Sequence, residues 1–332
     1  MHDALPMISI VTPSYNQAQF LEETILSVLS QDYPSIEYLI IDGDSTDGSV
    51  EIIRKYEDRL AYWVSEPDQG QSQAINKGFQ RANGEILAWM NSDDVYCPGA
   101  MRAAVDFLRL HPDVALVYGR AELIDGDGAT LLPIPWEDFD VPTCITRQRY
   151  PIPQPAAFFR REAVQRVGLL DERLHYCLDW DYWIRIGMAG LKVSKIPQTL
   201  ARCRLHRDSK TVGELLKPNE EMVAWVDRFF SQPLPRGIAE LERQSRSRAL
   251  LSLGRQHLYA NQYASARRAI LSGSLLYPRS LLRDRALSLF TLSLLPGSVI
   301  KLVLTLKDMW FGSPPALEAR IRATGIARAG SR

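Results

Sequence analysis

The sequence predicts an α/β fold, with a Rossmann-like, mostly parallel sheet flanked by helices and an all-helical C-terminal region. Three observations support this prediction. Short apolar runs alternate with segments of helical periodicity through the first hundred residues. Each run is apolar on both faces, which is typical of strands buried within a parallel sheet. After residue 237 the chain shows helical patterns only.

Four apolar runs are expected to form strands, at residues 7–11, 36–41, 60–65 and 85–90. Helical spacing predicts helices over 20–29, over 50–56 and around 75–79. The first of these stops at Tyr33-Pro34, because the residue before a proline disfavours the helical conformation. A polar cluster follows every run: TPSYN, DGDSTDGS, EPDQGQ and NSDD. Ligands bind beyond the carboxyl ends of parallel strands, so these clusters predict a common cleft.

The pattern changes beyond residue 113. Residues 114–119 predict another strand, 121–132 a hairpin around an Asp-Gly pair, and 131–155 a loop-rich stretch with six prolines. A helix is expected over 163–167, ending at Gly168, and another begins at LDWDYW. Because 231–237 read as a linker, we expect one domain over 1–235 and a helical region over 236–332. Within the helical region, residues 240–278 resemble a single tetratricopeptide-like helix pair.

Charge is distributed unevenly along a chain whose formal net charge is zero. Residues 241–332 hold 15 Lys and Arg against 4 Asp and Glu, so this part carries +11. A basic tail suggests peripheral contact with an anionic membrane surface, although a helical appendage with a solvated arginine face is the plain alternative. No nucleic-acid partner is expected. The uncharged stretch 286–300 is too short to span a membrane and is interrupted by Pro296-Gly297.

The cysteines and the N-terminus indicate the compartment. Four cysteines lie far apart without a CxxC pair, which predicts reduced thiols rather than a zinc site or disulfides. The first residues lack the basic and apolar segments of a signal peptide. We therefore expect a cytoplasmic protein, peripheral at the inner face of the membrane if the basic tail binds there.

The polar clusters limit the chemistry. No GxGxxG follows the first strand, and neither GxxxxGK[ST] nor GxSxG occurs, which disfavours a dinucleotide fold, a P-loop and an acyl-enzyme hydrolase. Adjacent carboxylates at a strand end, Asp93 and Asp94, suit a hard divalent cation shared with substrate phosphates. Such a cation, Mg²⁺ or Mn²⁺, stabilises the charge on a departing diphosphate. Taken alone, an Asp-Asp pair is more often a helix cap or a turn.

Over residues 7–210 the chain resembles the family 2 glycosyltransferases. The resemblance rests on ISIVTPSYNQAQFLEETILSVLSQDYPSIEYLIIDGDSTDGS, SEPDQGQSQAINKGFQRANGEILAWMNSDD and PIPQPAAFFRREAVQRVGLLDERLHYCLDWDYWIRI. It implies a GT-A fold and transfer, with inversion, from a UDP-, GDP- or dTDP-sugar. The implied acceptor is a hydroxyl of a glycan or lipid-linked saccharide, in cell-surface polysaccharide or glycolipid assembly.

The resemblance also implies a donor site. Pro13 and Tyr15 correspond to the segment that stacks on the donor base, and Asp42 to the carboxylate that hydrogen-bonds it. The second Asp of that family motif is Gly43 here, which puts the base contacts in question. Lys77 is implied to face phosphate, with an exposed helix lysine as the alternative. The residues implied to bind the nucleotide sugar are Pro13, Tyr15, Asn16, Asp42, Asp68, Lys77 and Asp93.

The family's metal motif, often DxDD, corresponds to residues 91–94. Asp94 is implied to coordinate a divalent metal, and Asp93 to approach the donor ribose or the metal. Asn91 adds no charge at the first motif position. His206 corresponds to a histidine that touches metal or diphosphate in many family members, although a lone histidine is more often structural.

The catalytic base is implied by LDWDYW, which matches a family segment whose acid deprotonates the acceptor hydroxyl. Asp179 takes that place, at a helix N-terminus that favours its ionised form. Gln154 is implied on the acceptor side. Asp181 and Arg185, four residues apart, are expected to form a structural pair.

Two other classes of function compete with a transferase. A nucleotidyltransferase on a similar sheet needs a Gly-rich, Arg-containing loop after the first strand, and TPSYNQ lacks both. A non-catalytic nucleotide-sugar binder or scaffold predicts a broken catalytic set, whereas Asp42, Asp94, Asp179 and His206 are all present.

Overall fold

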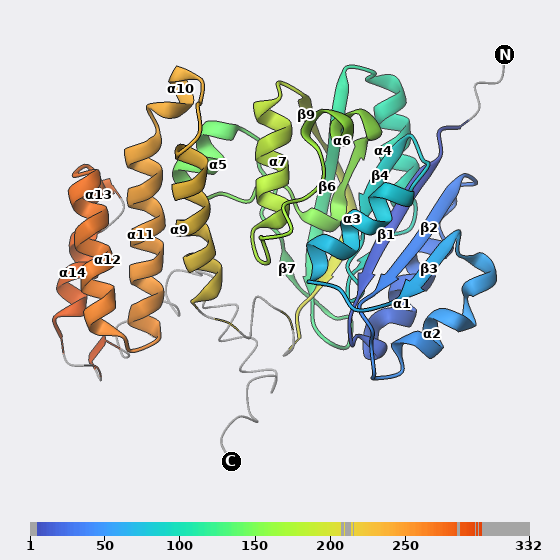
Figure 1. The fold of residues 1–332 in the computed structure, drawn as a ribbon, viewed down its shortest axis with the longest axis horizontal. Helices are drawn as coiled ribbons and strands as arrows, with labels where there is room; N and C mark the ends of the chain where they lie inside the picture. The colour runs from blue at the N-terminus through green and yellow to red at the C-terminus, as the bar shows by residue number, and fades with distance from the viewer. Residues whose placement is uncertain are drawn as a thin grey trace. The chain divides into compact units, whose positions relative to one another are not determined.

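A computed structural model describes residues 5–206, 209, 214, 216–283, 286–295, 297, 299 and 300 (Figure 1). Contacts between Cα atoms divide the chain into two compact units. The first comprises Met1–Cys144 with Tyr150–Leu205, and the second comprises Ile145–Arg149 with His206–Arg332. A boundary between independently folding domains at residue 235 remains a prediction.

One nine-stranded sheet forms the centre of the first unit, within the described part of the chain. Its order is β3-β2-β1-β4-β8-β6-β9-β5, and β7 pairs with β6 off this path. Neighbours from β3 to β4 run parallel, as do β6 and β9, whereas the pairs β4–β8, β8–β6, β9–β5 and β6–β7 are antiparallel. The strands are β1 Ile8–Ser14, β2 Ile36–Asp42, β3 Tyr62–Ser65, β4 Ile86–Trp89, β5 Val95–Tyr96, β6 Val114–Ile124, β7 Thr130–Pro133, β8 Ala157–Arg160 and β9 Lys192–Arg204.

Helices cover both faces of this sheet. The described helices are α1 Ala18–Leu29, α2 Ser49–Lys55, α3 Gln71–Arg81, α4 Ala100–Leu110, α5 Val141–Arg147, α6 Arg161–Val167, α7 Leu178–Met188, α9 Lys217–Phe230, α10 Arg236–Ala239, α11 Glu242–Tyr259, α12 Tyr263–Leu276, α13 Ser280–Arg283 and α14 Ala286–Ser293. One face of the sheet buries apolar side chains of α1, α2 and α4. The other packs on α3 and α7 through an aromatic cluster that includes Phe79, Trp89 and Trp183. Strands buried on both faces explain the continuous apolar runs of the sequence.

Close packing fixes α3 on the sheet. A Cβ at Gly78 would lie 2.3 Å from Cγ1 of Val11, so only glycine lets the helix approach β1 this closely. This contact sets the height of α3, whose first residue is Gln71, relative to the ends of β1 and β4.

The expected strands and helices of the first hundred residues are confirmed, as are the 121–132 hairpin and the stop at Gly168, where φ is +77°. The loop-rich stretch contains the short helix α5. β5, β8 and β9 are additions to the sequence-based expectation. β9 pairs with β5 so that Val95 lies opposite Arg202, which brings Cys203 and Arg204 beside the 91–94 turn.

The second unit is helical in its described part. α11 and α12 pack closely, because a Cβ at Gly254 would lie 2.7 Å from Cγ1 of Ile270. Its apolar core comprises Leu251, Leu258, Ala266, Ile270, Ala286, Leu289 and Ile300. Among the residues with described structure, no helix has both the length and the apolar character needed to cross a bilayer.

Candidate active site

The loops after β1 and β2 are joined by hydrogen bonds around Asp42. This carboxylate, fully buried at the end of β2, accepts the Ser45 N–H at 2.9 Å, the Ser45 hydroxyl at 2.6 Å and the Ser65 hydroxyl at 2.7 Å. Asn16, with φ of +50°, accepts the Thr46 N–H at 2.9 Å. Asp42 and Asn16 therefore both shape the 43–47 loop.

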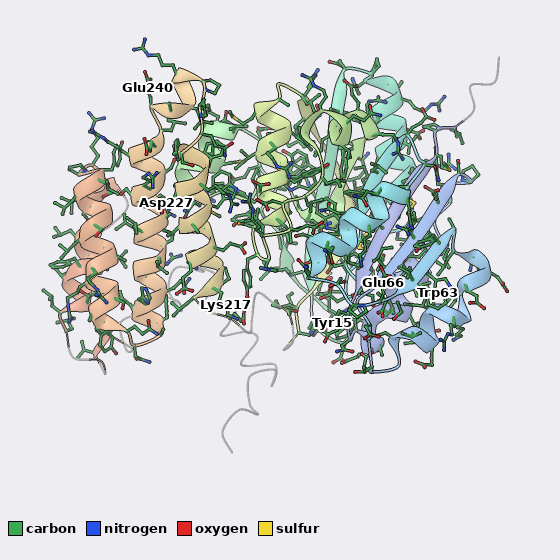
Figure 2. The ribbon with its side chains drawn as sticks, in the orientation of Figure 1. Tyr15, Trp63, Glu66, Lys217, Asp227 and Glu240 are labelled. Atoms are coloured by element: carbon green, nitrogen blue, oxygen red, sulfur yellow. The ribbon has the colours of Figure 1, made fainter. Side chains whose placement is uncertain are left out.

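Tyr15, Gly43 and Asp68 meet beside this loop. A Cβ at Gly43 would lie 2.9 Å from Oδ2 of Asp68 and 3.3 Å from Cδ2 of Tyr15. A side chain at this position, such as the carboxylate of the family pattern, would require the Asp68 carboxylate to shift. The Tyr15 ring is 62% exposed and available for stacking, at the same end of the sheet as Glu66 (Figure 2).

Two other predicted donor residues have different surroundings. Pro13 is buried within β1. Lys77 of α3 forms an ion pair with Glu66, with 2.9 Å between Nζ and Oε1. For Lys77 to contact phosphate as predicted, its ammonium group must either leave Glu66 or bind Glu66 and phosphate together.

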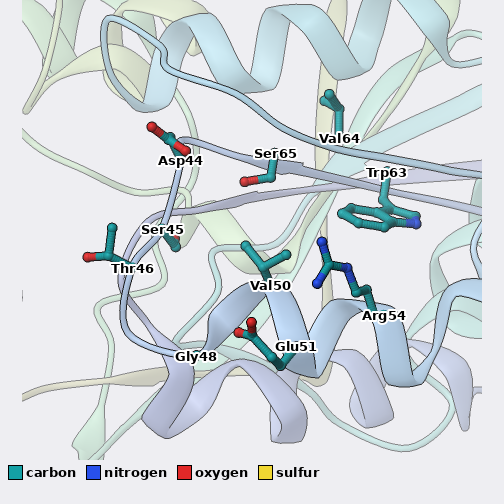
Figure 3. Close-up of a pocket in the computed structure, with 10 residues that line it drawn as sticks. All are labelled: Asp44, Ser45, Thr46, Gly48, Val50, Glu51, Arg54, Trp63, Val64 and Ser65. Carbon is teal, nitrogen blue, oxygen red and sulfur yellow. The ribbon is translucent and has the colours of Figure 1, made fainter.

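A hollow of about 550 Å³ lies between α2, β3 and the 44–48 loop (Figure 3). Ser45 and Ser65, which hold Asp42, form part of its wall. Trp63 of β3 and Arg54 of α2 line the side of the hollow that is opposite the 44–48 loop, and their side chains point toward each other. The hollow thus combines an aromatic ring, a cation and hydroxyl groups next to the Asp42 network.

Residues 91–94 form a turn at the end of β4, which Arg204 holds from β9. Asp94 is buried, and its Oδ1 accepts the Arg204 N–H at 2.8 Å. The Arg204 guanidinium donates to the Asp93 carbonyl and to Glu23 Oε2, at 3.0 and 2.6 Å. Burial, and next the charge of Asp93, raise the pKa of the Asp94 carboxyl well above its usual range.

Asn91 and Gln154 also meet at this turn. The Asn91 amide donates to Gln154 Oε1 at 3.0 Å and to Asp94 Oδ2 at 3.2 Å. Gln154 donates to the Trp89 carbonyl at 2.8 Å, and Gln71 donates to Asn91 Oδ1 at 2.6 Å. Predicted residues from separate parts of the sequence, Gln154 and Asp94, are thus brought to one strand end.

Asp179 lies in the first turn of α7, partly buried. Its Oδ1 accepts the Trp180 N–H at 2.8 Å, and within the described residues Asp179 takes part in no ion pair. Burial raises the pKa of this carboxyl to about 6, against an ordinary value of 3.8. Burial therefore affects this pKa more than the helix N-terminus does. Roughly nine-tenths of the Asp179 carboxyl groups are still ionised at pH 7.

The charges of Asp93, Asp94 and Asp179 all act on the thiol of Cys203. Burial raises the pKa of Cys203 well above its usual value, and the charges of these three carboxylates raise it further, Asp94 most and Asp179 least. The predicted metal-binding acids and the predicted base therefore lie in one region of the molecule, around Cys203 of β9.

His206 directly follows Leu205, after β9, and belongs to the second unit. It is buried, and its backbone N–H donates to the Ser209 hydroxyl at 3.1 Å. Its role as a metal ligand stays a prediction.

The chain matches the family model described as Glycosyl transferase family 2 over residues 9–168. An uncharacterized glycosyltransferase of Mycobacterium tuberculosis is 30% identical over 186 residues, which are 55% of this chain and 70% of that protein. The chain belongs to glycosyltransferase family 2. An uncharacterized glycosyltransferase of Rickettsia typhi is 28% identical to this glycosyltransferase, over 68% of this chain and 72% of the relative. TuaG of Bacillus subtilis, whose name assigns it to teichuronic acid biosynthesis, is 33% identical over 38% of this chain and 51% of TuaG.

Solved structures share the fold of this glycosyltransferase. The S. aureus TarS fragment 1-349 in complex with UDP-GlcNAc has a TM-score of 0.60 and 15% identity, over 86% of this chain and 90% of that one. The mannosyltransferase PcManGT of Pyrobaculum calidifontis, in complex with GDP-Man and Mn²⁺, has a TM-score of 0.57 and 19% identity, over 93% and 88%. These similarities confirm the predicted GT-A-like α/β fold.

The donor set of the glycosyltransferase fits a divalent cation that arrives with its substrate. No cluster of three or more His, Cys, Asp or Glu side chains suited to a metal occurs in the described part of the chain. Burial, and next the charge of Asp93, nevertheless raise the pKa of Asp94, and a bound cation would offset both effects on the ionised carboxylate. Mg²⁺ and similar ions are often held by one or two carboxylates, with phosphates completing the shell.

Sequence reasoning missed two residues of this site, Gln71 and Arg204. The Arg204 side chain is almost fully buried and binds α1, the 91–94 turn and the 125–126 turn. A buried arginine is rare without several acceptors, but one sequence offers no signal of which acceptors surround it. Gln71 carries no charge and belongs to no pattern that one sequence would flag.

Proposed function

We propose that this glycosyltransferase moves a sugar from a nucleoside diphosphate donor to an acceptor hydroxyl, with inversion at the anomeric carbon. Family membership supports the reaction type, and two structural neighbours bind UDP-GlcNAc and GDP-Man. The observation that carries the proposal is that Asp179 lies near enough to Asp93 and Asp94 for all three carboxylates to act by charge on Cys203 of β9, which follows Arg202 opposite Val95. This arrangement gives an ionisable base and a diphosphate-binding pair within one region.

Asp179 is proposed as the general base. Its Oδ1 accepts the Trp180 N–H, while its Oδ2 makes no hydrogen bond within the described residues. Oδ2 takes the proton of the acceptor hydroxyl as the hydroxyl oxygen bonds to the anomeric carbon. The bond from that carbon to the diphosphate oxygen breaks with its electron pair, and the nucleoside diphosphate leaves. A pKa of about 6 suits this role, because general bases work best when their pKa lies near the operating pH.

The nucleoside is proposed to bind over Asp42. Tyr15 and Asp68 lie near Gly43, and Trp63 lines the hollow that Ser45 and Ser65 also border. Tyr15 is the expected stacking partner, with Asn16 supporting its loop. Tyr15→Ala should raise the donor KM by roughly tenfold, because stacking on a base contributes ~1–3 kcal/mol. A larger effect of Trp63→Ala would instead assign the base to the hollow of Figure 3.

Asp94 and Asp93 are proposed to hold Mg²⁺ or Mn²⁺, with His206 as a further ligand. When bound, the cation would neutralise charge on the leaving diphosphate. The residues of the chain prepare this site in two ways. Arg204 and Asn91 each donate one hydrogen bond to Asp94 and so fix its carboxylate. The Asp93 carbonyl is fixed by the Arg204 guanidinium, which leaves the Asp93 side chain outside the core.

The acceptor is proposed to be a cell-surface glycan precursor, reached at the inner face of the membrane. The name of TuaG supports the first part, and an apolar surface on the second unit supports the other. Among the described residues, twelve large hydrophobic side chains are exposed, and eight of them lie between residues 271 and 299. Leu275, Leu287 and Leu294 are 80%, 55% and 60% exposed, in a part of the chain rich in arginine. The predicted apolar and basic residues beyond 300 lie outside the described residues.

The test of the proposed function is nucleotide release from a panel of UDP-, GDP- and dTDP-sugars with Mg²⁺ or Mn²⁺, with and without a glycan acceptor. One donor should give acceptor-dependent release of its nucleoside diphosphate. Binding of a donor without any release, across the panel and a range of acceptors, would favour a non-catalytic binder and contradict the proposal.

A further inference from the structure

Four polar groups at the end of β4 form a chain of amide hydrogen bonds. Gln71 Nε2 donates to Asn91 Oδ1, Asn91 Nδ2 donates to Gln154 Oε1, and Gln154 Nε2 donates to the Trp89 carbonyl. The heavy-atom distances are 2.6, 3.0 and 2.8 Å. The same Asn91 NH₂ group donates its other hydrogen to Asp94 Oδ2, at 3.2 Å.

The direction of this chain is fixed at the Trp89 end. A backbone carbonyl can only accept, so the Gln154 NH₂ group must face Trp89. Its Oε1 then faces position 91 and requires a donor there. Asp94 Oδ1 accepts the Arg204 N–H, and Asp94 Oδ2 likewise accepts from position 91. Residue 91 must therefore donate two hydrogen bonds, one to Gln154 and one to Asp94, and must accept one from Gln71. The side-chain amide of asparagine meets all three requirements.

We propose that Gln154 and Gln71 are positioning residues that orient the Asn91 amide, and through it the Asp94 carboxylate, so that position 91 must carry an amide. An aspartate at 91 would restore a carboxylate to the motif NSDD, but it would present an oxygen to Gln154 Oε1 and to Asp94. If the Gln154 amide rotated, its NH₂ group could donate to the aspartate at position 91. Its Oε1 would then face the Trp89 carbonyl oxygen, so that two acceptors would oppose each other there. A buried donor or acceptor without a partner is costly, and neighbouring carboxylates repel.

The stability test uses Asn91→Asp, which is almost isosteric, in the full chain with EDTA present. Its Tm should fall, whereas Asn219→Asp should change Tm by less than about 2 °C. Asn219 lies in the first turn of α9, and its side chain makes no hydrogen bond within the described residues, so this control adds the same charge outside the network.

A double-mutant cycle isolates the contribution of Gln154. Gln154→Met keeps the length of the side chain and removes both polar atoms. In that background the Tm loss caused by Asn91→Asp should be smaller by about 2–6 °C, since directly coupled residues interact at this level. An equal loss in both backgrounds, or an Asn91→Asp protein as stable as the wild type, would overturn the proposal. If Gln154→Met does not fold, Gln154→Ala takes its place in the cycle.

The activity test separates positioning from binding of the acceptor, and it rests on the proposed transferase function. Through Asp94, Gln154→Met and Gln71→Met should raise the Mn²⁺ concentration for half-maximal rate by at least about threefold and lower kcat, with the acceptor KM within twofold of wild type. A rise in the acceptor KM alone would make Gln154 an acceptor ligand and refute the positioning role. The Tm cycle in EDTA is independent of any turnover, so a failure of the proposed function would not be mistaken for a failure of this inference.

Discussion

Asp179→Asn should make the protein more stable at neutral pH while it removes transfer. The Asp179 carboxyl has a pKa of about 6 in the folded protein because burial disfavours its charge. Its ordinary value is 3.8, so the folded state binds the proton more tightly than the unfolded state does. Stability is therefore lost as pH rises from about 4 to about 6, and the full cost is present above that range.

The size of this cost follows from the two pKa values. Their difference corresponds to about 3 kcal/mol, which is an upper limit because the side chain is only partly buried. An asparagine still accepts the Trp180 N–H through its Oδ1 and never ionises. The variant should thus gain about 1–3 kcal/mol relative to the wild type between pH 4 and pH 7.5. At ~2–4 °C per kcal/mol this is a relative rise in Tm of several degrees.

The assay is thermal unfolding of both proteins from pH 4 to pH 8, in EDTA and without substrate. Asp181→Asn is the contrasting variant, because Asp181 pairs with Arg185 at 2.8 Å and the loss of this ion pair should lower Tm. A Tm difference between Asp179→Asn and wild type that stays constant across this pH range would refute the reasoning. It would mean that Asp179 titrates as an ordinary solvated carboxylate.

Three further predictions concern metal, donor and membrane. EDTA should abolish transfer and Mn²⁺ or Mg²⁺ should restore it, so full activity in chelator would contradict the proposed role of the Asp pair. Gly43→Ala should raise the donor KM severalfold, because the added Cβ would lie 2.9 Å from Asp68 Oδ2 and displace this carboxylate, while Tm should change by less than about 2 °C. An unchanged KM would show that donor binding does not need Asp68 in its present position. The full chain should float with anionic liposomes at low salt. The double variant Leu275→Ser with Leu287→Ser should lower the membrane partition constant by at least about 100-fold, since burying each leucine contributes ~1.5–3 kcal/mol. Leu110→Ser, at a site 77% exposed in the first unit, is the control, and equal loss in both variants would argue against a membrane surface at 271–299.

Much of the fold was predictable because its first half follows one physical rule. Strands buried on both faces need continuous apolar runs, and the polar clusters after β1, β2 and β4 do lie at one edge of the sheet. The antiparallel strands were harder to foresee. The apolar run of β8 is only three residues long, and β9 mixes polar and apolar residues around a proline, so neither shows a long continuous run.

The site was predictable where charge or a family motif marked a residue, and less so where shape decided. Asp94 and Asp179 stand out as acids in motifs, whereas the pKa of Asp179 depends on burial by residues far away in sequence. The space available to a side chain at position 43 depends on the positions of Tyr15 and Asp68. The direction of the Asn91 amide depends on a backbone carbonyl, a group that every residue has and that no sequence pattern reveals.

The most direct test of the central claim is the transfer rate of Asp179→Asn with a saturating donor, measured beside the donor Kd of the same variant. A base that acts only on the acceptor proton should leave the donor Kd within about twofold and reduce kcat by ~10²–10⁴-fold. A variant that keeps more than roughly a tenth of the wild-type rate would contradict the assignment of Asp179 as the base of this glycosyltransferase.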